Sequence, residues 1–568
     1  RSIGRLTVWS VLVIAALAWA GAMDGCAPGG GGGGGGGQGP GQGELNGPCL
    51  PNDTCNAGLD CVDSVCVAGG EGEGEGEGEG EGEGEGEGEG EPEGGIPAER
   101  LQPADFTYEG AFRLPDDFNW GALGLSFHPN GGDGVGSLLV TGFELLSDPA
   151  HAGESCWDPA WDCQASFGEV AIPTPAVEAN WEDLPEATIV TGLTSFDGGL
   201  ASTVHREYVY VSGIEYVPRR GSQTGDKLYG SINLWYAEGV AGEDTFPTVW
   251  FANLDGTGAQ GMFHVGPEET PYHGRKTGTY LFSVPAWYAD QYLGGRTLVT
   301  GRSRGTPADG SEELTTRGGS QGPTLFAFQA ADSDSPTGDL DALPVLYYRV
   351  SFPGCAGPNV GDPAECDYPE FTMCDDWTGG AFADDGARRA IMLLGYKGMG
   401  DNCYDEPPVE CNDPCSDSHG YHCQPYERQV IFYDVHELGE NALGDQDPWV
   451  VVPYTTWRPD EFYLSGETCS NAGGMAFDGQ ADRLFMVERG LGGSDTNASV
   501  VHVWSVQQEV ATSAWSGLGA YPQTFVAQKG GRVGSLFTRT LQVGFSAEKR
   551  LPTFFDVRWT GRGTGWRR

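Results

Sequence analysis

Basic residues are scarce in this chain of 568 residues, which has 31 lysines and arginines against 81 aspartates and glutamates. The formal net charge is −50. Because the phosphates of nucleic acids repel such a surface, we expect no nucleic-acid partner. The sequence also lacks an H-E-x-x-H zinc motif and a phosphate-binding loop, and its glycine-rich stretches have the composition of linkers. The sequence therefore gives no support for a nucleic-acid-binding protein, a zinc protease or a P-loop enzyme. It predicts the architecture of the protein better than its ligand.

Aromatic residues are plentiful, with 16 tryptophans, 25 phenylalanines and 21 tyrosines. A chain with this much apolar ring surface can bury a core, so it is not disordered throughout. The length allows two or more domains, or one large β domain.

The N-terminal region has the pattern of a secretory signal peptide. Arg1 and Arg5 precede an apolar run at 6–20, which is shorter than the ~20 residues of a membrane span. Cleavage after Ala22 is one reading. The other is that 23–26 resembles the lipobox of bacterial lipoproteins, which implies a signal peptide over 1–25 and acylation of Cys26.

Cysteine parity favours the lipoprotein reading, because removing Cys26 leaves 14 cysteines, an even number. We therefore expect a membrane partner through a lipid anchor and a location in the cell envelope. Ala27 after the cysteine resembles lipoproteins of the outer membrane surface. If Cys26 is not acylated, the protein is secreted.

Three segments of unusual composition follow the signal. Residues 26–48 are a glycine-rich tether, 49–66 hold four cysteines, and 67–97 are dominated by Glu-Gly pairs. The four-cysteine segment resembles the small disulfide-rich modules of bacterial surface lipoproteins, with a zinc knuckle or a calcium site at Asp53, Asp60 and Asp63 as alternatives. Like charges and glycine predict a disordered linker at 67–97, either a spacer or a cation-collecting tail.

Residues 98–506 have a globular composition and remain acidic, since 61 acidic and 20 basic residues lie within 96–506. The remaining 507–568 differ, with nine basic and three acidic residues. This atypical tail is either a basic extension that folds back on the acidic domain or the product of a changed reading frame, and it is a candidate for disorder.

A three-part unit recurs in the globular region. A glycine-led segment comes first, then a strong apolar strand, then an alternating strand. The glycine-led segments are 124–127, 199–202, 261–264, 380–383 and 474–477; the strong strands are 137–142, 207–213, 296–301, 390–395 and 483–488; the third strands are 169–172, 232–236, 324–328, 429–434 and 501–505.

This repeat resembles the blades of a β-propeller whose loops carry insertions. Five units are visible, and the interval between Gly261 and Gly380 has room for a sixth. The orphan strand at 106–114 would complete the last blade and close the ring. The expected fold class is thus all-β, a propeller of about five to six decorated blades; a two-sheet sandwich is the alternative.

The cysteines after Cys26 are expected to form disulfides, since the compartment is oxidising. Those near 355–423 belong to an insertion too polar to have its own core. Cys411 and Cys415 with His419 and His422 suggest a zinc site as the weaker alternative. The expected disulfide cysteines are Cys49, Cys55, Cys61, Cys66, Cys156, Cys163, Cys355, Cys366, Cys374, Cys403, Cys411, Cys415, Cys423 and Cys469.

No residue group stands out as catalytic, and we assign no catalytic or metal-binding residue. A propeller site would lie on the axis at the ends of inner strands. Calcium is the one cofactor considered, at the alternating carboxylates of 332–341. Candidate polar groups for an axial site are Asn119, Asp197, His205, His264, Asn471 and Glu488, for which strand-end hydrogen bonding is the alternative; His128 and His436 have the setting of surface histidines.

Three functions fit these features. The first is a lipid-anchored surface protein whose propeller binds an extracellular glycan or protein without catalysis. The second is a secreted propeller hydrolase or lyase for polysaccharides or lactones, with Trp120, Trp157, Trp161 and Trp181 as candidates for stacking on sugars. The third is a structural component of the envelope. We expect the first.

Overall fold

The computed structural model divides the chain into two units, 1–94 and 95–568. No helix in the part of the chain that it describes is long and apolar enough to cross a membrane. The described residues are 59–62, 65–68, 99–146, 163–201, 209–234, 247–266, 277–303, 322–349, 367–405, 410–415, 420–459, 461–462, 464, 471–493 and 496–507. The predicted signal peptide, Cys26, the tether, residues 69–97 of the predicted Glu-Gly linker and the tail from 508 lie outside them.

The described residues of the first unit form an antiparallel hairpin of β1 (Leu59–Val62) and β2 (Val65–Ala68), in which Cys61 lies opposite Cys66. The hairpin belongs to the predicted cysteine-rich module, whose other two cysteines are outside the described residues.

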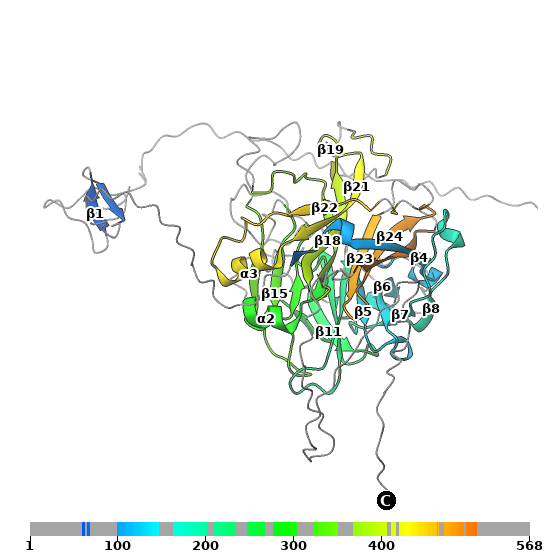
Figure 1. Ribbon diagram of the computed structural model, residues 1–568. Helices are drawn as coiled ribbons and strands as arrows, with labels where there is room; N and C mark the ends of the chain where they lie inside the picture. The colour runs from blue at the N-terminus through cyan, green and yellow to red at the C-terminus, as the bar shows by residue number, and fades with distance from the viewer. Residues whose placement is uncertain are drawn as a thin grey trace, which may run out of the picture. The chain divides into compact units, whose positions relative to one another are not determined.

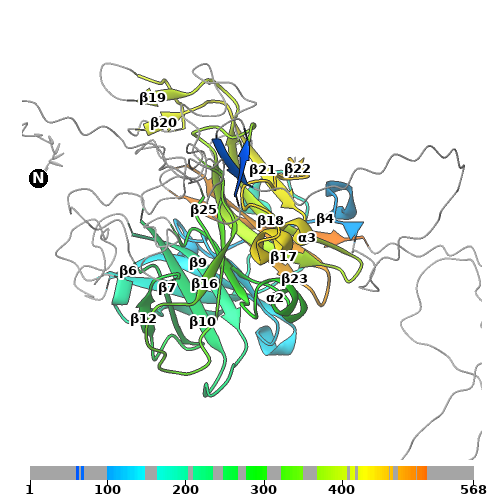
Figure 2. The ribbon, with the colours of Figure 1, turned by 90° about the vertical axis from the view of Figure 1, so that its left-hand side faces the viewer.

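The described residues of the second unit form five sheets, each built on four antiparallel strands (Figures 1 and 2). In four of them these strands follow one another in chain order, and in the fifth the last strand comes from the start of the domain. Blade 1 contains β5 (Leu125–His128), β6 (Ser137–Leu146), β7 (Cys163–Ala171) and β8 (Thr188–Ser195). Blade 2 contains β9 (Val209–Val217), β10 (Lys227–Leu234), β11 (Val249–Asn253) and β12 (Gln260–Phe263). Blade 3 contains β13 (Leu281–Ser283), β14 (Leu298–Thr300), β15 (Leu325–Phe328) and β16 (Ala342–Leu346).

Blade 4 contains β17 (Asp376–Asp384), β18 (Arg388–Gly398), β21 (Tyr426–Tyr433) and β22 (Thr455–Trp457), with the short β3 (Glu99–Arg100) pairing in parallel with β18. Blade 5 contains β23 (Asn471–Asp478), β24 (Arg483–Leu491), β25 (Ala498–Val506) and β4 (Phe106–Arg113). The two α-helices among the described residues, α2 (Ala286–Tyr292) and α3 (Val435–Leu443), follow β13 and β21. This is the predicted all-β propeller, with five blades.

The innermost strands form a closed ring, in which β5, β9, β13, β17 and β23 each contact the next and β23 contacts β5. Glycine permits this close approach. A Cβ on Gly474 would lie 2.4 Å from the backbone nitrogen of Leu125, and one on Gly213 would lie 2.7 Å from the Cβ of Leu281. These glycines therefore hold neighbouring inner strands at the distance that the ring requires.

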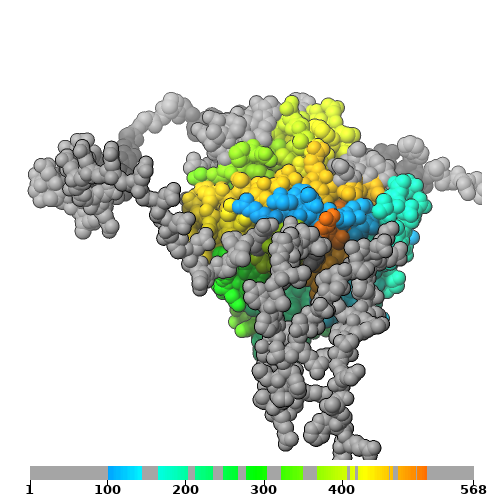
Figure 3. Space-filling model, in the orientation of Figure 1, coloured from blue at the N-terminus to red at the C-terminus, as the bar shows by residue number. Residues whose placement is uncertain are grey.

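Strand β4 closes the ring as the fourth strand of blade 5. It pairs with β25 in antiparallel register, with Phe112 opposite Val501 and Ala111 opposite His502. Figure 3 shows the N-terminal segment (blue) beside the C-terminal strands (orange) on the surface. The backbone N–H of Gln507 donates to Asp105 at 2.7 Å, so the two ends of the domain are joined. The prediction for the orphan strand at 106–114 is confirmed.

The apolar core lies between the blades. Each pair of neighbouring blades encloses one cluster of buried side chains, so the ring has five such clusters. Trp250, Trp377 and Trp504 are each at most 1% exposed within them. A fully buried aromatic side chain contributes ~2–3 kcal/mol from area removed from water, so these interfaces supply most of the stability of the ring.

Two of the five glycine-led segments, 199–202 and 261–264, were wrongly predicted as the first strand of a blade. Residues 199–201 of the segment predicted at 199–202 lie in a tight turn and a short helical segment, and the inner strand of blade 2 is β9. Gly261 lies in β12, the outermost strand of blade 2, where a Cβ would meet the Trp250 side chain at 2.9 Å. The described residues between Gly261 and Gly380 form blade 3 and no sixth blade.

The insertion in blade 4 is held by disulfides. Cys374 is bonded to Cys423 and Cys403 to Cys411, and Cys415 is disulfide-bonded too. The insertion contains the hairpin of β19 (Cys403–Asp405) and β20 (Gly420–His422), which projects from the ring (Figure 2). Because Cys411 is oxidised, it is not a thiolate zinc ligand. The other predicted disulfide cysteines have no described side chain.

Candidate functional site

A cavity of about 720 Å3 opens on the axis of the ring, on the face where each innermost strand turns into the second strand of its blade. We call this the turn face. Every blade contributes lining residues from its innermost strand or the turn after it, so the ring closure itself builds the cavity. The lining residues are Phe127, Pro129, Glu215, Tyr216, Pro218, Phe282, Ser283, Val284, Pro285, Gly380, Ala381, Phe382, Asp384, Asp385, Gly386, Met475, Ala476, Phe477, Gly479, Gln480 and Asp482.

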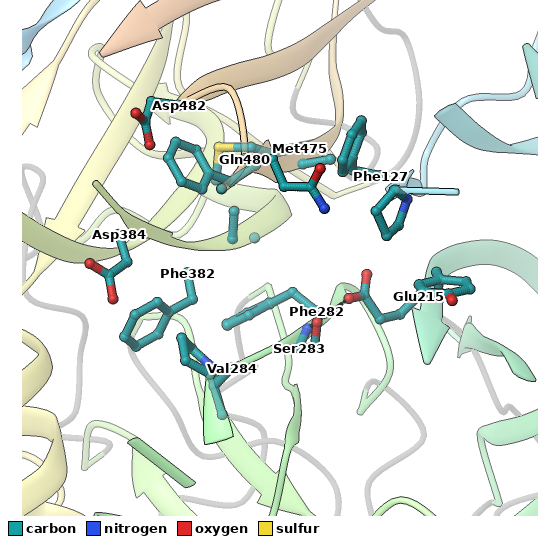
Figure 4. A pocket seen from close by; sticks show the side chains of 18 of the residues that line it. Phe127, Glu215, Phe282, Ser283, Val284, Phe382, Asp384, Met475, Gln480 and Asp482 are labelled. Atoms are coloured by element: carbon teal, nitrogen blue, oxygen red, sulfur yellow. Dashed lines mark hydrogen bonds between the residues drawn. The ribbon is translucent and has the colours of Figure 1, made fainter. Parts of the chain in front are cut away.

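The lining combines aromatic rings with carboxylates, and no lysine, arginine or histidine is among its described residues. The rings come from Phe127, Tyr216, Phe282, Phe382 and Phe477, one for each blade. Figure 4 shows the carboxylate of Glu215 on one side of the cavity and those of Asp384 and Asp482 on the other. An apolar pocket with a few placed polar groups is the usual form of a small-ligand site.

Glu215 is held by three donors from the neighbouring inner strands. The hydroxyl of Ser126 on β5 donates to its Oε2 at 2.8 Å, and the backbone N–H of Ser283 on β13 donates to its Oε1 at 3.1 Å. The hydroxyl of Ser283 also donates to Oε1. Ser126 is oriented in turn by the backbone N–H of Tyr216 at 3.0 Å. The carboxylate is thus fixed where three blades meet.

Desolvation raises the pKa of Glu215 from 4.5 to about 7, and the hydrogen bonds from Ser283 and Ser126 oppose this rise. No cation among the described residues is a cause of this shift. Glu215 therefore exists in both protonation states near neutral pH and can donate or accept a proton there.

Two of the three aspartates that line the cavity have arginine partners. Asp384 lies 3.0 Å from Nε of Arg389, and Asp385 lies 2.7 Å from Nη2 of Arg388. Arg388 also contacts Asp105, so its charge is shared between two carboxylates. The hydrogen-bond partners of Glu215, Ser126 and Ser283, are by contrast uncharged.

His128 belongs to a polar network beside the cavity. Its Nδ1 lies 2.9 Å from Oε1 of Glu169, which also accepts from the hydroxyl of Ser137 at 2.5 Å. These bonds, with that of His128 first, hold the pKa of Glu169 below its usual range. The side chains of the His128–Glu169 pair are only 12% and 13% exposed, so the prediction of an ordinary surface histidine was wrong.

Glu488 belongs to a second network, inside blade 5. Its Oε2 lies 3.0 Å from Nε2 of His502, and Nδ1 of His502 lies 2.9 Å from the hydroxyl of Tyr108. Both members of the Glu488–His502 pair are fully buried. None of its three residues lines the cavity, and the network joins β4 to the rest of the blade.

The other predicted polar groups do not converge on the axis. Asp197 is buried and accepts from the backbone of Ala165 and Ala201, each at 3.0 Å, and burial raises its pKa. His264 pairs with Asp339 at 3.0 Å. None of the five described candidates lines the cavity. Asn119 ends a short 3-10 helix, Asn471 is exposed at the start of β23, and His205, Trp157 and Trp161 lie outside the described residues.

The alternating carboxylates at 332–341 bind different groups. Asp334 lies 2.6 Å from Lys227, and Asp341 lies 2.7 Å from Arg296. Together with the Asp339–His264 pair, these contacts direct the carboxylates to three separate partners. They do not form the shared oxygen cage that calcium needs.

Sequence reasoning missed Glu215 because the residues that hold its carboxylate are far from it along the chain. Ser126 and Ser283 lie 89 and 68 residues from it along the chain. Glu215 itself is one acidic residue near the end of β9, beyond the strand predicted at 207–213. The property that distinguishes Glu215 is the burial of its carboxylate near the axis, which only the structure shows.

Comparisons with known proteins add little beyond this. No family model matches the chain, and no curated protein matches it. Among solved structures, a protein of unknown function from Dyadobacter fermentans has 10% identity over 71% of this chain and 100% of its own, with a TM-score of 0.29. A Trypanosoma rangeli sialidase has 10% identity over 65% of this chain and 43% of its own, with a TM-score of 0.27.

Proposed function

We propose that this protein is a lipid-anchored, cell-surface binding protein whose propeller holds a group of an extracellular partner in the axial cavity of the turn face. The observation that carries the proposal is the cavity itself. All five blades converge on it, each blade adds one aromatic ring to its wall, and its volume is in the range of small-ligand sites. A glycan or a protein side chain presents groups of this size.

The anchor part of the proposal depends on the sequence. The apolar run at 6–20, the lipobox-like segment ending at Cys26 and the glycine-rich and Glu-Gly segments up to 97 have the order of signal, attachment site and spacer. Mass spectrometry of the mature N-terminal peptide tests it. A diacylated or triacylated Cys26 is the expected result, and an unmodified peptide that starts at residue 23 contradicts it.

The binding part is tested with the full-length chain carrying Cys26→Ser, which removes the acylated thiol, on arrays of glycans and peptides. Gln480 is exposed at the turn after β23 and lines the cavity, so Gln480→Trp narrows the mouth without replacing a buried residue. Glu109→Gln, on the exposed face of β4, is the matched control.

Binding by the wild-type sequence and the control, with at least tenfold weaker binding by Gln480→Trp, is expected. Equal binding by all three proteins would place the ligand elsewhere and contradict the proposal. Failure to retain any glycan or peptide would favour a structural role in the envelope.

A hydrolase or lyase of polysaccharides or lactones is the second candidate, and Glu215 favours it. A carboxyl with a pKa of about 7 inside an apolar cavity has the proton affinity of a general acid at neutral pH. The test is turnover of aryl glycosides and lactones by the wild type and by Glu215→Gln. Turnover that the substitution abolishes supports catalysis, and an absence of turnover by the wild type contradicts it.

A further inference from the structure

We infer that the axial cavity recognises a compact organic cation, an alkylammonium or quaternary ammonium group, held between the aromatic rings and the carboxylate of Glu215. This inference rests on the proposed function, because it names the chemical class of the group that enters the cavity. It is carried by the lining residues and their partners.

The first argument is the composition of the wall. Five rings surround the space, and Phe282 and Phe382 are themselves 4% and 7% exposed, so their positions are fixed by the core behind them. Phe382 packs against Tyr288 of α2 with ring centroids 5.1 Å apart. The faces of fixed aromatic rings attract a cation, and a desolvated site strengthens this attraction.

The second argument is the balance of charge. Arg388 and Arg389 at the rim are each bound to aspartates, which leaves the Glu215 carboxylate to be neutralised by whatever enters the cavity. Its hydroxyl and amide partners hold it in place but supply no positive charge. A phosphate, sulfate or carboxylate ligand would be repelled at this position, whereas an ammonium group would pair with it.

The third argument is the electrostatic field around the mouth of the cavity. Residues 96–506 have 61 acidic and 20 basic residues, so the domain as a whole attracts cations toward its surface. A cleft lined by carboxylates and walled by apolar side chains concentrates that field. The charge of the domain and the chemistry of the cavity therefore favour the same class of ligand.

The test uses two probes of nearly the same shape, choline and its neutral isostere 3,3-dimethyl-1-butanol, with calorimetry at pH 8 on the full-length chain carrying Cys26→Ser. At this pH the Glu215 carboxyl is mainly ionised. The variants are Glu215→Gln, which keeps the size of the side chain and one acceptor oxygen but removes the charge, and Glu109→Gln as the control.

Choline should bind the wild type and the control about tenfold more tightly than it binds Glu215→Gln, and about tenfold more tightly than the neutral alcohol binds the wild type. Equal affinities for choline and the alcohol, or no binding of choline at millimolar concentration, would overturn the inference. If Gln480→Trp still abolishes glycan or peptide binding in that case, the proposed function stands and only the ligand class is wrong.

Discussion

The titration of Glu215 predicts how the stability of the ring changes with pH. In the folded protein, desolvation raises the pKa of this carboxyl from 4.5 to about 7, so the folded state holds the proton more tightly than the unfolded chain. The stabilisation from protonation is complete below the unfolded value and is lost as the pH rises through the folded one. The wild type should therefore lose stability between about pH 5 and pH 8.

The magnitude follows from the size of the shift. A rise from 4.5 to about 7 corresponds to at most ~3 kcal/mol. Glu215 is half-buried at an open cavity, so water screens part of this cost, and we expect about 1–2 kcal/mol to be measured. Glu215→Gln removes the titrating group and should unfold with a flatter dependence on pH.

The assay is urea unfolding of the full-length wild type and Glu215→Gln, followed by tryptophan fluorescence at several pH values. Comparing the two proteins at each pH cancels the contributions to stability that do not depend on Glu215. A difference in unfolding free energy that does not change from pH 5 to pH 8 would refute the reasoning about Glu215.

Three further substitutions test the disulfide of blade 4 and the closure of the ring by β4. Cys374→Ser opens the bridge to Cys423, which spans 49 residues, and should lower the unfolding free energy by about 4 kcal/mol under oxidising conditions but have little effect in dithiothreitol. Phe112→Ala creates a cavity behind the closing strand β4 and should cost about 3–5 kcal/mol in urea unfolding, whereas Glu109→Ala on the exposed side of that strand should cost under about 0.5 kcal/mol. Equal effects of the two β4 substitutions would argue against closure by that strand.

The repeat in the sequence predicted three blades closely. In blades 1, 4 and 5 the glycine-led segment is the inner strand, because Gly124, Gly380 and Gly474 lie where neighbouring strands crowd around the axis. The orphan strand at 106–114 was recognisable because it alternates but has no unit of its own. Local strand patterns therefore predicted the inner strand correctly in the blades where the leading glycine serves close packing at the axis.

Blades 2 and 3 were placed less accurately because glycine also serves other packing needs. Gly261 makes room for Trp250 in an outermost strand, and Gly199 lies in a turn with a φ of +83°. The cavity was harder still to predict from the sequence. Glu215, Ser126 and Ser283 meet only because three separate blades surround one axis, and no local pattern in a single sequence encodes that meeting.

The most direct test of the central claim is a crystal structure of the full-length chain with choline at pH 8. The account predicts five blades closed by β4 and the ammonium group on the axis, between Phe282, Phe382 and the carboxylate of Glu215. An empty cavity with choline bound elsewhere, or a ring in which Glu215 does not face the axis, would contradict it.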